Sequence, residues 1–273
     1  MKLLIVYFSA TGNTEKIALA LRDRCLADGH EVSLRDITTP EGRREGITSR
    51  EYDGIFFGFP IHSHRAPRIA RQWLETLEGG GVKCATFFTY GAFTVHPCHW
   101  WTRAQLEGRG FRLVSSAEFL GFHTFNLGGW RAAPGRPDGR DYAVAEEFAR
   151  RTLKRFSGED EAVPGEFPRT DMTEKFLDDI EQFRFMVLTE LPSRRGADCG
   201  MCMKCAELCP SGAMDAVKGE ADPGRCIACL RCVAVCPEGA IKINDMKGSW
   251  GTKLEMEGLS EEEACAKQSA IYL

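Results

Sequence analysis

Apolar segments alternate with longer mixed segments through the first 157 residues of the chain. Residues 2–8 are apolar at almost every position, and such a short continuous run is typical of a strand that is buried on both faces of a parallel sheet. Residues 31–37 instead alternate between apolar and polar side chains, which indicates an outer, less buried strand. The pattern predicts five strands in all, at residues 2–8, 31–37, 54–59, 82–89 and 111–119.

The segments between these strands carry apolar residues at helical spacing. After the first strand, Ile17, Leu21 and Cys25 form one stripe, and Gly29 is a candidate C-cap. Further helices are predicted at residues 67–78, 101–108 and 142–156. Because strands and helices alternate, we predict an α/β fold with a doubly wound, five-stranded parallel sheet and helices on both of its faces.

The character of the chain changes after residue 157. A charged stretch with several glycines and prolines precedes a predicted helix at 173–188, whose buried stripe would be Phe176, Ile180 and Phe183. Near the C-terminus, Ser260 and Glu263 form a candidate capping box that opens a short helix. The predicted organisation is an N-terminal domain at 1–157, a linker and packing helix at 158–190, a small domain at 191–245 and a tail at 246–273.

Composition and charge exclude several classes of function. The length of 273 residues suggests about two domains, and a hydrophobic share of 43% supports a sizeable core. A net charge of -4 argues against nucleic-acid binding, and no apolar run is long enough to predict a membrane-spanning helix. Twelve cysteines without a secretory signal indicate a reducing compartment, so we expect a cytoplasmic protein.

Eight of the cysteines form a duplicated motif. The pattern C-x2-C-x2-C-x3-C-P occurs twice. The residues that end each motif are also similar: Cys-Pro-Ser-Gly-Ala in the first corresponds to Cys-Pro-Glu-Gly-Ala in the second. Soft thiolates at this spacing suit iron–sulfur clusters. The predicted cluster ligands are Cys199, Cys202, Cys205 and Cys209 in the first motif, and Cys226, Cys229, Cys232 and Cys236 in the second.

Two other uses of these cysteines compete with the cluster interpretation. A disulfide framework fits an oxidising compartment, which the absence of a secretory signal disfavours. A pair of zinc sites is often built from CxxC pairs, and it does not require three cysteines at two-residue intervals followed by a fourth before proline. The repeated spacing therefore favours two [4Fe–4S] clusters.

A second candidate site lies between the first strand and the first helix. Residues 9–14 read Ser-Ala-Thr-Gly-Asn-Thr, so hydroxyl groups, backbone amides and a helix N-terminus converge there. This arrangement suits a phosphate group, and Gly12 permits a close approach of the backbone. An ordinary N-cap loop is the alternative, since serine, threonine and asparagine favour such positions in any case.

These motifs resemble two known families. Residues 1–157 resemble the flavodoxins, because Ser9, Thr11, Gly12 and Thr14 match every position of their S/T-x-T-G-x-T phosphate loop. The cysteine motifs resemble those of the bacterial two-cluster ferredoxins, which form a small α+β domain. The whole chain thus resembles the fused flavodoxin–ferredoxin proteins of anaerobes.

The resemblance implies FMN and two [4Fe–4S] clusters as cofactors. It also implies crossed ligation, in which Cys209 completes the cluster of the second motif and Cys236 that of the first. The flavodoxin-like part would hold FMN at the carboxyl ends of its strands, with the flavin ring between two loops. The implied FMN-binding residues are Ser9, Thr11, Gly12, Asn13 and Thr14 in the phosphate loop, Pro60, Ile61, His62, Ser63 and His64 in the first ring loop, and Thr89, Tyr90 and Gly91 in the second.

The ring loops depart from the flavodoxin pattern of a tryptophan and a tyrosine in an acidic surround. The first loop carries His62, His64 and Arg65 instead, and a cation that faced the flavin would favour its reduced, anionic form. Each of these side chains is otherwise an ordinary polar loop residue. Cys98 follows the second loop, where a packed thiol is the plainer interpretation and a nucleophile the alternative.

The combined motifs predict an electron-transfer protein that passes electrons between two clusters and FMN and on to a redox protein. Fusion of the two domains would keep one centre at a high effective concentration near the other. The alternative is a flavin-dependent oxidoreductase that reduces a small molecule, with His62, His64, His96 and Cys98 around its substrate. The sequence does not identify the electron donor or acceptor.

Overall fold

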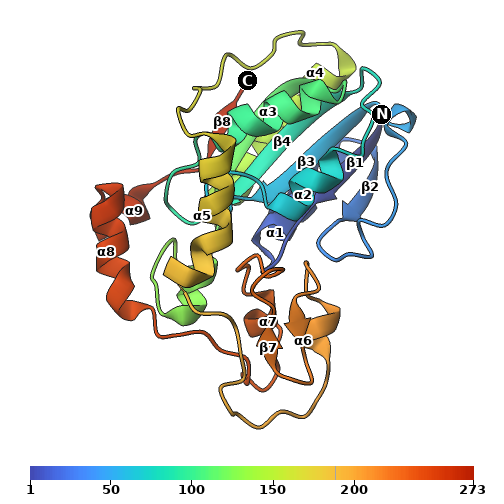
Figure 1. Cartoon of the computed structure of the whole chain (residues 1–273). Coiled ribbons are helices and arrows are strands. Elements are labelled where there is room, and N and C mark those ends of the chain that lie inside the picture. The colour runs from blue at the N-terminus through green and yellow to red at the C-terminus, as the bar shows by residue number, and fades with distance from the viewer. Residues whose placement is uncertain (188) are drawn as a thin grey trace.

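A six-stranded sheet forms the centre of the N-terminal domain in the computed structural model, which describes residues 1–187 and 189–273 (Figure 1). The strand order is β2-β1-β3-β4-β5-β8. The five strands predicted from the sequence are present and run parallel to one another, which confirms the predicted α/β fold. Their bounds are β1 Lys2–Tyr7, β2 Glu31–Asp36, β3 Gly54–Pro60, β4 Lys83–Tyr90 and β5 Arg112–Leu120.

Helices cover both faces of this sheet. Side chains alternate along β1, so that Leu3 and Ile5 pack with α1 (Asn13–Ala27) and α4 (Gly139–Ser157) on one face. Leu4 and Val6 point to the opposite face, where α2 (Arg68–Leu74) and α3 (Cys98–Gly108) lie. Two short 3-10 helices, η1 (Ser49–Glu51) and η2 (Thr124–Gly128), interrupt the connecting loops. The sheet is therefore doubly wound, and β1 and β3 are buried on both sides.

The sixth strand, β8 (Ala270–Tyr272), comes from the C-terminal tail and was not predicted. It pairs antiparallel with β5, with Ala117 opposite Ile271. Ser269 fixes the approach to this strand, since its hydroxyl accepts a hydrogen bond from Leu120 N at 3.1 Å and donates one to Asp141 Oδ1 at 2.5 Å. The tail thereby covers the edge of β5 that would otherwise present unpaired backbone groups.

Helix α5 (Glu174–Val187) follows the linker and lies beside the sheet (Figure 1). Residue 188, at the end of the predicted helix, and the side chain of Phe183 lie outside the described residues. The predicted buried stripe is wrong for Phe176, which is 50% exposed, whereas Leu177 is fully buried. The reason is that charged contacts orient this helix: Glu181 accepts hydrogen bonds from Arg71 Nη1 at 2.9 Å and from Arg68 N at 2.7 Å.

The cysteine-rich domain lies at one end of the sheet, and its two motifs adopt the same local structure (Figure 1). Helix α6 (Lys204–Glu207) in the first motif corresponds to α7 (Arg231–Ala234) in the second. Met203 and Leu230, which immediately precede these helices, both have a positive φ, at 60° and 56°. The domain also contains a two-stranded antiparallel sheet of β6 (Met214–Asp215) and β7 (Glu220–Ala221). The duplication in the sequence is thus a duplication of structure.

The tail forms α8 (Lys247–Glu257) and α9 (Glu261–Ala266) before it reaches β8. The predicted capping box is confirmed, because Ser260 Oγ accepts from Glu263 N and the Glu263 carboxylate accepts from Ser260 N. Helix α8 packs against the N-terminal domain through buried Trp250 and through a hydrogen bond from Trp130 Nε1 to Ser249 Oγ at 2.9 Å. None of the helices in the described ranges combines the length and the apolar character that crossing a bilayer requires.

Candidate functional site

The loop between β1 and α1 presents a row of free hydrogen-bond donors. Gly12 has a φ of 93°, a left-handed conformation that suits glycine, and it forms the N-cap of α1. In the described parts of the chain, the backbone amides of residues 10–14 donate to no other group. Ser9 Oγ accepts from Glu15 N at 3.1 Å, which leaves the hydroxyl hydrogen free to donate. This donor set fits a phosphate dianion without any lysine or arginine in the loop.

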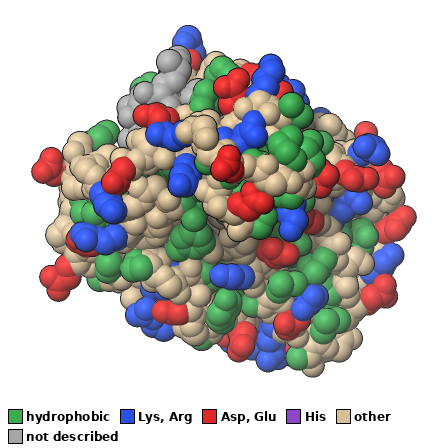
Figure 2. Space-filling view, turned by 90° about the horizontal axis from the view of Figure 1, so that it is seen from below, with side chains coloured by type: hydrophobic (Ala, Val, Ile, Leu, Met, Phe, Trp, Pro, Cys, Tyr) green, Lys and Arg blue, Asp and Glu red, His purple; other side chains and the backbone are tan. Residues whose placement is uncertain are grey.

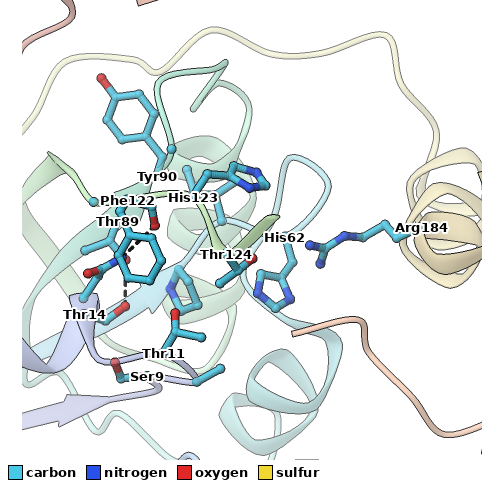
Figure 3. Close-up of a pocket in the computed structure, with 16 residues that line it drawn as sticks. Ser9, Thr11, Thr14, His62, Thr89, Tyr90, Phe122, His123, Thr124 and Arg184 are labelled. Carbon is cyan, nitrogen blue, oxygen red and sulfur yellow. Dashed lines mark hydrogen bonds between the residues drawn. The ribbon is translucent and has the colours of Figure 1, made fainter. Parts of the chain in front are cut away.

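Side chains of the loop connect it to the neighbouring strand ends. Thr14 Oγ1 lies 2.7 Å from Thr89 Oγ1 at the end of β4, and Asn13 Nδ2 donates to Phe122 O at 2.9 Å beyond β5 (Figure 3). The Asn13 Oδ1 atom is buried and has no partner in the described residues. A cavity of about 460 Å³ lies among these groups. The predicted residues that line it are Ser9, Thr11, Asn13, Thr14, Pro60, Ile61, His62, Thr89, Tyr90 and Gly91.

A second, more open cavity adjoins the first and shares Ile61, Tyr90 and Gly91 with it. It encloses about 1680 Å³, including its open mouth, and two further predicted residues, Ser63 and His64, line it. Its walls also carry the aromatic side chains of Phe93, Phe125 and Trp130. Helices α5 and α8 close it on the outside. The two cavities together fit a phosphate attached to a flat aromatic ring, which is the shape of FMN.

Several lining residues were not predicted as part of the site. Phe122, His123 and Thr124 follow β5, and Arg184 extends from α5 toward His62 and Thr124 (Figure 3). The loop at 121–141 carries no recognisable motif. It follows the parallel strand β5, however, and ligands of open α/β sheets bind at the carboxyl ends of the strands, so its position in the chain indicates this edge of the sheet. A Cβ atom on Gly91 would lie 2.5 Å from His123 Cβ, so glycine is required where these two loops meet.

The buried histidines of the site are neutral. Burial, together with the charges of Arg184 and Lys253, lowers the pKa of His123 to about 3. His123 Nδ1 accepts a hydrogen bond from Phe125 N at 3.1 Å, which fixes its neutral tautomer with the proton on Nε2. Burial, followed by the charge of Arg184, also lowers the pKa of His62 well below its usual value. Neither imidazole therefore supplies positive charge to the cavities at neutral pH.

Three residues near the ring loops lie outside the cavities. Arg65 is buried against Trp101 and forms ion pairs with Asp178 and Glu181, so it anchors α5 and does not face the flavin position. His99 bonds to Ser116 Oγ at 2.7 Å. Cys98 is fully buried, and burial raises the pKa of its thiol to about 12, in keeping with the prediction of a packed thiol.

The eight motif cysteines differ in burial, and four of them, Cys199, Cys205, Cys226 and Cys236, are half-buried. Cys209, Cys229 and Cys232 are buried, whereas Cys202 is exposed. Burial raises the pKa values of the Cys226, Cys229 and Cys232 thiols, and the neighbouring Cys209 contributes to the increase at all three. The pKa of Cys205 is raised by burial and then by Cys199 and Cys202. Cys209 thus lies near the thiols of the second motif, as crossed ligation requires.

Backbone amides point at sulfur atoms in both motifs. Ala213 N and Ala240 N donate to the sulfurs of Cys209 and Cys236, each at 3.2 Å. Such bonds stabilise thiolate ligands and tune the potential of an iron–sulfur cluster. No three histidine, cysteine or acidic side chains within the described ranges are grouped closely enough to hold a single metal ion. A four-iron cluster does not need such a group, because each thiolate binds a different iron.

The second motif packs directly onto the N-terminal domain. Ile227, Cys229 and Leu230 belong to the same apolar core as Phe125 and Trp130. Arg231 Nη1 donates to the carbonyl oxygens of Ser9 at 2.8 Å and Ala10 at 3.1 Å, both in the phosphate loop. The buried cysteine group and the phosphate loop are therefore held together by a direct contact between the domains.

Comparisons with known proteins agree with this geometry. The family model of the flavodoxin domain matches residues 4–89, and that of the 4Fe-4S dicluster domain matches residues 191–248. A curated relative, the flavodoxin-like domain-containing protein BilS of Clostridioides difficile (strain CD3), is 34% identical over 92 residues, which are 34% of this chain. The chain spans about half of the length of that relative, 48%.

Solved flavodoxins also resemble the N-terminal part of the chain. Oxidised Flavodoxin 2 from Bacillus cereus is 25% identical and is matched over 100% of its length and 59% of this chain, with a TM-score of 0.43. A flavodoxin from the domain Archaea is 14% identical and is matched over 99% of its length and 57% of this chain, also with a TM-score of 0.43. The chain thus carries a segment that matches a flavodoxin domain near its N-terminus and one that matches a 4Fe-4S dicluster domain near its C-terminus.

Proposed function

We propose that this protein carries electrons between a redox partner and FMN through two [4Fe–4S] clusters arranged in series. The cluster of Cys226, Cys229, Cys232 and Cys209, called here the inner cluster, would lie next to FMN. The cluster of Cys199, Cys202, Cys205 and Cys236, called here the outer cluster, would face solvent and the partner. Iron–sulfur clusters exchange single electrons, and FMN, when bound, supplies a centre that accepts one or two.

One observation carries this order of the sites. The second motif contacts the FMN phosphate loop through Arg231 and contributes Cys229 to the core beneath the flavin cavities, whereas Cys202 of the first motif is exposed. These contacts support a cluster next to the flavin and a second, more open cluster position. Because the two domains are packed together, transfer between them would not depend on diffusive encounters.

The residues of the cavities would hold FMN without any further cation in the phosphate loop. The amides of residues 10–14 and the hydroxyls of Ser9 and Thr11 would bind the phosphate, with the N-terminus of α1 favouring its negative charge. The aromatic walls at Phe93 and Trp130 would take the ring. Of the predicted residues, Ser63 and His64 line only this ring cavity, and Ile61, Tyr90 and Gly91 line both cavities. Gly12 lines neither cavity and would contribute through the turn of its backbone.

A redox protein would dock at the end of the molecule that carries the outer cluster. Met201, Met203 and Val217 are apolar side chains that remain exposed in this domain. Figure 2 views the molecule from below and shows acidic and basic side chains mixed over this face, with hydrophobic side chains between them. Such a mixed face suits a transient partner without a strong preference for one sign of charge.

The alternative, a flavin oxidoreductase acting on a small molecule, lacks the side chains that it was expected to use. Cys98 is fully buried with a raised pKa, so it is not an activated nucleophile. His96 is exposed outside the lining of both cavities. His62 and His64 line the cavities, where they contribute to the FMN position.

Flavin fluorescence tests the order of the sites. A neighbouring cluster quenches bound FMN, so the anaerobically purified protein should fluoresce weakly. We expect Cys229→Ala, which removes an inner ligand, to increase the fluorescence per bound flavin severalfold. Cys202→Ala, the matched change at the outer cluster, should leave it nearly unchanged. The order is wrong if Cys202→Ala gives the larger increase.

A further inference from the structure

Arg184 is a buried cation that forms no ion pair within the described residues. Its side chain reaches from α5 into the wall shared by the two flavin cavities, and the residue is only 8% exposed (Figure 3). Within the described residues no carboxylate lies at ion-pairing distance from it. The carboxylate of Glu181, one turn earlier on α5, is already bound to Arg71 Nη1 and Arg68 N. A buried guanidinium is expensive unless negative charge compensates it.

The surroundings of Arg184 show where that negative charge would come from. On one side its guanidinium donates to Ile227 O at 3.5 Å, in the middle of the sequence between Cys226 and Cys229. On the other side it faces the cavities that also contain His62, and it lies 5.4 Å from the ring of Phe125. His62 and His123 lie nearby and are neutral at pH 7, so neither adds positive charge to that of Arg184. Each neighbouring site would hold an anionic group: the second cysteine motif its thiolate-bound cluster, and the two cavities FMN.

We propose that Arg184 is a shared counter-charge for FMN and for the inner cluster, and that it favours the reduced form of both. This inference rests on the proposed function, because it requires both cofactors to be present. Reduction of the cluster by one electron, or of the flavin to an anionic form by one electron without proton uptake, adds one negative charge beside the guanidinium; the redox partner supplies the electron. A fixed positive charge in a buried site attracts that added charge strongly, because little water is present to screen it.

The position of the charge makes the proposal specific. Arg184 lies beside the second motif, because its guanidinium donates to Ile227 O. Neither motif lines the flavin cavities, and within the described residues the first motif makes no hydrogen bond with Arg184. The potential of the outer cluster should therefore respond much less to a change at Arg184 than the potentials of the flavin and the inner cluster.

Midpoint potentials of the three centres, measured by anaerobic redox titration with optical and EPR detection, test this proposal. We expect Arg184→Gln to lower the midpoint potentials of FMN and of the inner cluster by at least about 59 mV each, which corresponds to a tenfold change in the equilibrium constant of a one-electron reduction. Arg184→Lys keeps the charge and should restore most of each potential. Arg43→Gln is a matched control for the flavin potential: Arg43 also contacts the cluster domain, at Pro210 O next to the inner ligand Cys209, but it does not line the flavin cavities, so the FMN potential should stay unchanged.

The results separate an electrostatic role from a structural one. Potentials of FMN and the inner cluster that stay unchanged in a fully loaded Arg184→Gln protein would overturn the proposal. If Arg184→Gln loses flavin or iron, Arg184→Lys decides: retained cofactors at native potentials support a role of the charge, and loss of cofactors in this variant as well overturns it. Failure of the proposed function is recognised separately, because the unaltered protein would then lack FMN or one of the two clusters.

Discussion

Arg231→Met tests the contact between the inner cluster motif and the FMN phosphate loop. One nitrogen of Arg231 serves two carbonyl oxygens, of Ser9 at 2.8 Å and of Ala10 at 3.1 Å, so we count it as a single hydrogen-bonding group. A hydrogen bond from a charged group contributes about 1.5–3 kcal/mol. If this energy orients the phosphate loop, its loss should raise the dissociation constant of FMN about 10- to 100-fold, since about 1.4 kcal/mol corresponds to a factor of ten.

The assay is a fluorescence titration of FMN into flavin-depleted protein that retains its clusters. Arg231 lies between two cluster ligands, so iron content must be measured in the same samples. Arg225→Met is the matched control: Arg225 is an exposed arginine of the same domain that bonds to Ser211 O at 3.3 Å, and within the described residues it makes no hydrogen bond to the phosphate loop. An Arg231→Met protein with full iron content and an FMN affinity within threefold of the unaltered protein would refute the reasoning.

Three further predictions concern the ligands, the phosphate loop and pH. Under crossed ligation, Cys209→Ala combined with Cys229→Ala should damage one cluster, whereas Cys209→Ala combined with Cys202→Ala should damage both. EPR counting of intact clusters tests this. Crossed ligation is rejected if the Cys209→Ala/Cys202→Ala protein keeps one four-thiolate cluster and the Cys209→Ala/Cys229→Ala protein keeps none. Thr14→Val removes the buried contact of 2.7 Å between the hydroxyls of Thr14 and Thr89. It should weaken FMN binding about fivefold, which corresponds to a loss of about 1 kcal/mol. An unchanged dissociation constant in the FMN titration would show that Thr14 does not belong to the site. His123 has a pKa of about 3 in the folded protein against 6.5 ordinarily, so at pH values between these two only the unfolded chain binds the proton. The free energy of unfolding should therefore fall with decreasing pH by up to about 1.4 kcal/mol per pH unit. Urea unfolding at pH 7.5 and 5.5 should show a shallower pH dependence for His123→Asn than for the unaltered protein, and an equal dependence would contradict this explanation.

The parts of the fold that follow local patterns could be predicted from the sequence. The five parallel strands are continuous apolar or alternating runs, and each lies within a residue or two of its predicted bounds. The phosphate loop is a short motif whose residues are contiguous, so its hydroxyls and amides converge without help from distant parts of the chain. The capping box at Ser260 is a local motif of the same kind.

The parts that depend on contacts between distant segments could not be predicted. Strand β8 is only three residues long, too short for a periodic signal, and it exists because the edge of β5 is available. The orientation of α5 follows from charge pairs of Asp178 with Arg65 and of Glu181 with Arg71, which override the apolar stripe expected at Phe176. Arg184 enters the site only because of this orientation.

The same limitation applied to Arg65. As a cation in a ring loop, it was a candidate to face the flavin, but the carboxylates of Asp178 and Glu181 draw it toward α5 instead. Those partners are more than a hundred residues away in the sequence, so no local pattern indicates the pairing. The arginine that lines both flavin cavities is Arg184, and Arg65 lines neither.

The central claim, that electrons pass between the inner cluster and FMN within one chain, is tested most directly by the concentration dependence of flavin reduction. The clusters would be reduced with a rapid photochemical pulse under anaerobic conditions, and the appearance of reduced flavin followed by absorbance over a tenfold range of protein concentration. An intramolecular process predicts a first-order rate constant that is the same at every concentration, and one that is lost in Cys229→Ala. A rate that rises in proportion to protein concentration would contradict the claim, because the electrons would then be passing between molecules.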